Sequence, residues 1–142
     1  MLKSGCIILS IWSALNIIPS IGIVVGILFL GKNTPALTAL LSDAEVNALG
    51  IAVLDTANSI AVFANGLNIG LCLLMLIAIW KGLFQKMTWA FWALVSASGF
   101  ALLAGIGADV VVGTQFPEIN AISGLILLTG FLLSAKEVFR DK

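Results

Sequence analysis

The sequence predicts an all-α, polytopic membrane protein, with four transmembrane helices in one bundle and one or two short interfacial helices in the first external loop. Hydrophobic residues make up 61% of the 142 residues and charged residues only 10%, whereas soluble domains carry about 25% charged residues. Four apolar segments are long enough to cross about 30 Å of hydrocarbon at about 1.5 Å per residue. None has a charge near its middle. We expect a single four-helix transmembrane domain over residues 1–142.

The predicted spans cover about residues 6–30, 58–80, 88–112 and 119–135. The first resembles a signal peptide at its start, where Lys3 precedes an apolar run, but that run is too long for a cleaved segment. Pro19 lies within this span and cannot donate a backbone hydrogen bond to the carbonyl of Leu15, so we expect a kink. The fourth span is the shortest. Glu118 follows Pro117 at its start, where a carboxylate suits the helix dipole.

The external loop, residues 31–57, contains two helix-start patterns. Pro35 in "NTPALTALL" stands at the first position of a predicted short helix, where proline is favoured. "SDAE" matches a capping box, with Ser42 as the N-cap and Glu45 three residues later. We therefore expect two short helices along the outer surface. The alternative is that residues 43–57 extend the second span outward.

Lysine and arginine are distributed unequally about the four spans. Six of the seven lie on one side: Lys3, Lys81, Lys86, Lys136, Arg140 and Lys142. Only Lys32 lies on the other side, so the positive-inside rule places both termini and the 81–87 loop in the cytoplasm. Trp80 and Trp89 flank this loop, where an interfacial aromatic belt is expected. The predicted location is a cell membrane, taken to be a bacterial inner membrane, crossed several times with cytoplasmic N- and C-termini.

The composition also limits the possible chemistry. The chain has no His and no Tyr, and Arg140 is its single arginine. Haem, di-iron and most catalytic zinc sites use His, which is also the commonest general base. Cys6 and Cys72 are offset by about 12 Å along their helices, too far for a disulfide. We therefore predict no catalytic residues, no metal and no cofactor, and the zero net charge indicates no nucleic-acid partner.

Small residues recur at four-residue spacing within three of the spans. They form the pairs Gly22 with Gly26 and Gly66 with Gly70, and an alanine stripe of Ala93, Ala97, Ala101 and Gly105. In lipid, such positions let the backbones of two helices approach closely. We expect the alanine stripe to face another helix.

Asparagines within the spans suggest a polar intramembrane site. Asn58 and Asn65 are seven residues apart and share a helix face, and Asn68 lies in the same sector. Asn16, three residues before Pro19, is expected at the same membrane depth as Asn68 on an oppositely directed helix. Side-chain amides commonly hydrogen-bond between membrane helices, so we favour packing. The alternative is a polar lining for a solute path or a lipid headgroup pocket.

The candidate binding residues are Asn16, Asn65, Asn68 and Asp109. Asp109 is included because an ionisable residue inside a span is a functional candidate, although it lies about one turn from the outer boundary. The expected function is that of a non-catalytic accessory, assembly or lipid/protein-binding subunit rather than an enzyme. Its expected partners are the lipid bilayer and other membrane proteins or further copies of the chain. The alternative is an oligomeric transporter or channel for a neutral small solute or lipid.

Overall fold

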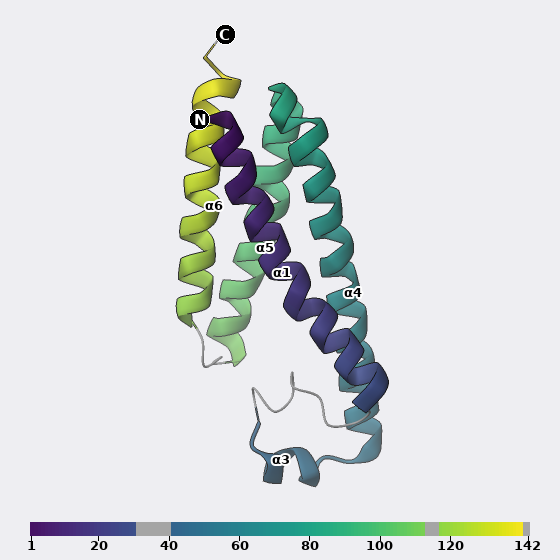
Figure 1. Cartoon of the computed structure of the whole chain (residues 1–142). Helices are drawn as coiled ribbons and strands as arrows, with labels where there is room; N and C mark the ends of the chain where they lie inside the picture. Colours follow the sequence, from purple (N-terminus) through teal and green to yellow (C-terminus); the bar gives the residue numbers. More distant parts are fainter. Residues whose placement is uncertain (31–40, 113–116, 141–142) are drawn as a thin grey trace. The chain divides into compact units, whose positions relative to one another are not determined.

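The computed structural model describes residues 1–30, 41–112 and 117–140, which contain helices and turns and no strand (Figure 1). The elements in chain order are α1 (Leu2–Leu30), α3 (Asp43–Ala48), α4 (Ile51–Lys81), the 3₁₀ turn η1 (Leu83–Gln85), α5 (Thr88–Val112) and α6 (Pro117–Val138). Four helices, α1, α4, α5 and α6, are long and apolar enough to cross a membrane. The predicted all-α membrane fold is confirmed.

The short helix α3 begins at the predicted capping box. The backbone N–H of Ser42 donates to the Glu45 carboxylate at 2.8 Å, and the backbone N–H of Glu45 donates to the Ser42 hydroxyl at 3.4 Å. These two bonds satisfy N–H groups that a helix start otherwise leaves unpaired. The other short helix, predicted at Pro35, lies outside the described residues.

The start of α4 is the largest departure from the predicted spans. The chain leaves the helical conformation at Leu49, whose ψ is 136°, and re-enters a helix at Ile51, seven residues before the predicted start. Gly50 lies at this break, as glycine commonly does just after a helix. Both alternatives for residues 43–57 are therefore correct in part, because a capped short helix is followed by an outward extension of α4.

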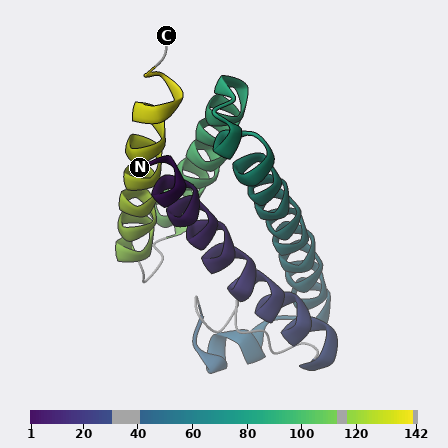
Figure 2. The same cartoon turned by 45° about the horizontal axis from the view of Figure 1, so that its top comes forward.

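The chain divides into two compact units, Met1–Leu15 with Leu71–Lys142 and Asn16–Gly70. In the first unit, α6 lies beside the N-terminal part of α1 in both views (Figures 1 and 2). Phe91 of α5 packs edge-on against Phe131 of α6 and against Phe139, with ring centroids 5.6 and 5.2 Å apart. The buried apolar core of this unit consists of Cys6, Leu9, Trp12, Met75, Ile79, Leu83, Ala90, Phe91, Leu94, Leu127 and Val138.

Glycines allow α1 and α6 to approach closely in this unit. A Cβ at Gly130 would lie 2.8 Å from the Cγ and Cδ2 atoms of Leu9. A Cβ at Gly5 would overlap the hydroxyl of Ser134 and lie 2.8 Å from the carbonyl oxygen of Gly130. Real Cβ atoms do not come this near to other heavy atoms, so both positions require glycine for this packing.

The glycine pairs expected to make close contacts do not do so where they are described. Among the described residues, a Cβ at Gly22, Gly66 or Gly70 would meet no heavy atom within 4 Å, beyond its own and adjoining residues and its own helix backbone. Four-residue spacing permits close packing without requiring it, and these surfaces lie open.

The alanine stripe of α5 is only partly at a helix interface. Ala97 and Ala101 are half-buried against the core, and a Cβ at Gly105 would lie 2.8 Å from Asn120 Oδ1 on α6. Ala93 is exposed, contrary to the prediction. Four residues turn an α-helix by about 400°, so each step drifts by about 40° and the stripe spans about 120° from end to end. Among the described side chains of α5, the buried ones are instead Ala90, Phe91, Leu94 and Ser98.

Candidate functional site

Asn68 makes the polar contact between α1 and α4 within the unit Asn16–Gly70. Its side-chain Nδ2 donates to the Ser20 hydroxyl at 2.9 Å and lies 3.5 Å from the backbone carbonyl oxygen of Asn16. Ser20 is buried, and Asn68 and Asn16 are half-buried. The structure therefore brings two of the predicted residues together beside Pro19, and it adds Ser20 as the main acceptor.

Asn65 does not join this cluster. It is half-buried, and its Nδ2 donates at 2.8 Å to the carbonyl of Ala61, one turn earlier on the same helix. The expectation that Asn65 forms a bond between helices is therefore not met among the described residues. Asp109 lies on α5, which belongs to the other compact unit, and its side chain is outside the described part of the structure.

The cluster of Asn68, Ser20 and the Asn16 carbonyl is electrically neutral. Amide and hydroxyl groups of this kind can hold two helices together or bind an uncharged polar group. Its main donor, Asn68 Nδ2, already has an acceptor inside the protein. Helix packing accounts for this arrangement.

The described ranges offer few side chains for metal binding or thiol chemistry. Residues 1–30, 41–112 and 117–140 hold no group of three or more His, Cys, Asp or Glu side chains that could bind a metal ion. Cys6 and Cys72 are both buried in the first compact unit and are not joined in a disulfide. Neither thiol is exposed to a solvent-borne reactant.

A groove at the N-terminal end of α4 was not predicted from the sequence. Its volume is about 570 Å³, and we call it the Asp55 groove; it is lined by Ile27, Leu28, Asp55, Asn58, Ser59, Val62 and Phe63. Asn58 is only 9% exposed, and its side-chain oxygen is buried with no hydrogen-bond partner among the described residues. Leaving a buried acceptor unpaired costs about 1–3 kcal/mol. This oxygen is therefore an acceptor whose hydrogen bond is not supplied within the described part of the protein.

A sequence signal for this groove exists. Asp55, Asn58, Ser59 and Val62 stand at i, i+3, i+4 and i+7, which places them on one face of a helix. The predicted second span begins at residue 58, which leaves Asp55 in the external loop and divides this face between a loop and a helix. Once α4 begins at Ile51, this polar face belongs to the helix.

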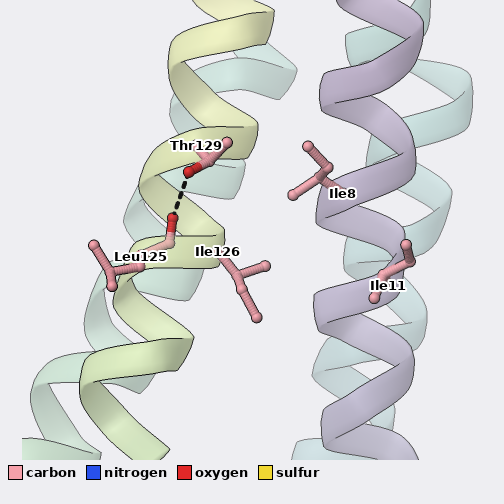
Figure 3. Close-up of a pocket in the computed structure, with 5 residues that line it drawn as sticks. All are labelled: Ile8, Ile11, Leu125, Ile126 and Thr129. Atoms are coloured by element: carbon pink, nitrogen blue, oxygen red, sulfur yellow. Dashed lines mark hydrogen bonds between the residues drawn. The ribbon is translucent and has the colours of Figure 1, made fainter.

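A second groove, in the first compact unit, lies between α1 and α6 (Figure 3). Its volume is about 360 Å³, and it is lined by Ile8, Ile11, Leu125, Ile126 and Thr129. Ile8 and Ile126 point toward one another across it (Figure 3). The Thr129 hydroxyl donates to the Leu125 carbonyl of its own helix at 2.8 Å. The groove thus presents mainly hydrocarbon and suits an acyl chain or an apolar side chain.

Trp12 supplies a further contact between α1 and α6 that the sequence did not reveal. Its indole Nε1 donates to the Ser123 hydroxyl at 2.6 Å. A buried indole N–H usually finds such a partner. With the glycine contacts described above, this bond fixes α1 against α6.

Comparison of the chain with protein-family models, with curated proteins and with solved structures finds no significant match.

Proposed function

We propose that the chain is a non-catalytic subunit of a cell membrane that binds lipid or another membrane protein and thereby serves an accessory or assembly role. The observation that carries the proposal is the hydrogen bond from Asn68 to Ser20. Through this bond, the main amide donor of the predicted intramembrane site has its acceptor within the protein itself. Polar groups that serve helix packing are paired in this way, whereas groups lining a solute path face an open lumen.

The two grooves support the binding role. The groove between α1 and α6 is lined almost wholly by apolar side chains, which an acyl chain can contact. The Asp55 groove adds polar groups at one end of α4. A bilayer supplies molecules with both kinds of surface.

The proposed location is the bacterial inner membrane, with both termini in the cytoplasm. The six-to-one distribution of lysine and arginine supports this orientation. Trp80 and Trp89 are 42% and 60% exposed, as side chains at a membrane interface are expected to be.

The test is purification of the full chain from native membranes in a mild detergent, followed by native mass spectrometry of the bound proteins and lipids. We expect a stoichiometric lipid or membrane protein to be retained. Ile126→Trp would fill the groove of Figure 3, and Leu132→Trp would place the same side chain at an exposed position of α6 that does not line it. A chain that retains nothing and carries a neutral solute across liposomes would refute the proposal and support a transporter.

A further inference from the structure

We infer that the Asp55 groove binds a phospholipid whose headgroup carries a primary ammonium. This inference rests on the proposed function and names the class of lipid. It follows from the acceptors that line the groove, from their depth along α4, and from the apolar side chains beside them.

The polar part of the groove presents hydrogen-bond acceptors. Asp55 is an exposed carboxylate, which accepts hydrogen bonds and carries a negative charge. The Ser59 hydroxyl donates its proton to the Asp55 backbone carbonyl at 2.8 Å, so its remaining capacity is as an acceptor. A primary ammonium has three N–H donors and a positive charge, and so complements these groups.

Asn58 supplies the acceptor that most needs a partner. The residue is 9% exposed, and its Oδ1 has no hydrogen-bond partner in the described part of the chain. The terminal torsion of an asparagine side chain is broad, and a half-turn about it would exchange the amide oxygen and nitrogen and so present the oxygen to the groove that the residue lines. An N–H donor placed there would remove the cost of an unpaired buried acceptor.

The depth of these groups matches a lipid headgroup. At about 1.5 Å per residue, counting about 20 residues back from Trp80 crosses about 30 Å of hydrocarbon and reaches Ala61. Asp55 and Asn58 then lie about 9 and 5 Å beyond the hydrocarbon boundary. Phe63 lies just inside it. The acceptors are therefore at headgroup depth and the apolar lining begins where acyl chains begin.

The apolar lining of the groove favours a lipid over a free ion as its ligand. Ile27, Leu28, Val62 and Phe63 make up more than half of the residues that line the groove. A metal ion or a small amine would leave these side chains without contacts, whereas the acyl chains of a phospholipid would cover them. The Asp55 charge disfavours a purely anionic headgroup, and a quaternary ammonium has no N–H to donate to Asn58.

The test compares three phospholipids with identical acyl chains, namely phosphatidylethanolamine, phosphatidylcholine and phosphatidylglycerol. Each is titrated into the delipidated full-length protein, and binding is measured by native mass spectrometry. We expect phosphatidylethanolamine to bind about fivefold more tightly than phosphatidylglycerol, the ratio that one partly exposed ion pair of about 1 kcal/mol supplies. Asp55→Asn should abolish this ratio. Glu118→Gln, which neutralises another exposed carboxylate near a helix start, should preserve it.

Asn58→Leu should reduce the preference for phosphatidylethanolamine over phosphatidylcholine, and Asn58→Ala provides the same test with a smaller side chain if the leucine variant does not fold. Equal binding of the three lipids by the parent chain, or an unchanged preference in Asp55→Asn, would overturn the inference. Lipid that is retained without headgroup preference would still support the proposed function. Loss of all bound lipid and protein in the native purification would instead count against the proposed function itself.

Discussion

Replacing Gly5 by alanine should destabilise the packing of α1 against α6. The added Cβ would overlap the Ser134 hydroxyl and lie 2.8 Å from the Gly130 carbonyl oxygen. Ser134 already donates to that carbonyl at 2.8 Å, so it cannot rotate away without breaking this hydrogen bond. The carbonyl belongs to the α6 backbone and can move only if the helix moves.

The expected magnitude follows from three effects. Overpacking a close contact costs about 1–3 kcal/mol, and losing the Ser134 hydrogen bond costs about 0.5–1.5 kcal/mol. Alanine favours the helix over glycine by about 0.5–1 kcal/mol, which offsets part of that cost. We therefore expect Gly5→Ala to lower the free energy of unfolding by about 1–3 kcal/mol.

The matched control is Gly66→Ala. In the part of the chain that the structure describes, a Cβ at Gly66 meets no heavy atom within 4 Å beyond its own and adjoining residues and its own helix backbone, so this variant should be neutral or more stable by up to about 1 kcal/mol. Unfolding of both variants in the same mild detergent, followed by circular dichroism, gives the comparison. Adding Ser134→Ala to Gly5→Ala should recover part of the loss, because one of the two overlapping groups is removed. Equal stability of Gly5→Ala and Gly66→Ala would refute the packing described here.

Three further predictions concern orientation, the alanine stripe and the cap of α3. In a chain without its native cysteines, Asn47→Cys should react with a membrane-impermeant thiol reagent in intact cells and Lys86→Cys should not. Labelling of position 86 from outside would contradict the predicted orientation. Ala97→Leu should cost about 1–3 kcal/mol of unfolding free energy by overpacking, whereas Ala93→Leu should cost little because Ala93 is exposed; similar melting of the two would contradict the interface. Hydrogen bonds from the side chain and backbone of the N-cap hold the pKa of Glu45 below its ordinary value. The cap should therefore persist at pH values above the ordinary pKa of a glutamate and be lost as the pH falls through the lowered pKa. Carbon chemical shifts of α3 that do not change with acidification would exclude this.

The spans and the α3 cap could be predicted from sequence because both depend on local patterns. The length of an apolar run sets the length of a span, and a capping box needs only Ser42 and Glu45. The contact between Gly5 and Gly130 could not be predicted in this way. These residues are far apart in the chain, and nothing local distinguishes them from Gly66 or Gly70, which form small-xxx-small pairs but make no close contact.

The candidate site was predicted in part for a similar reason. Asn65 and Asn68 are three residues apart, so their side chains differ by about 60° around the helix axis. Asn68 thereby reaches Ser20, while Asn65 bonds to its own helix. A sequence defines the sector in which a side chain lies, but the position of the neighbouring helix decides which member of that sector makes the contact. Predicting the Asp55 groove also requires the correct first residue of α4. The length of the apolar run places that start at residue 58, whereas the helix begins at Ile51.

The central claim is that the intramembrane amides hold helices together while another part of the surface binds lipid or protein. The most direct test measures thermal stability and the amount of retained lipid or partner on the same preparation of Asn68→Leu, beside the parent chain. We expect an intact fold, a loss of about 0.6 kcal/mol, the average for such bonds in one membrane protein, and unchanged retention. Loss of the retained molecule with no change in melting would contradict the claim, because it would place Asn68 in a binding site and not in helix packing.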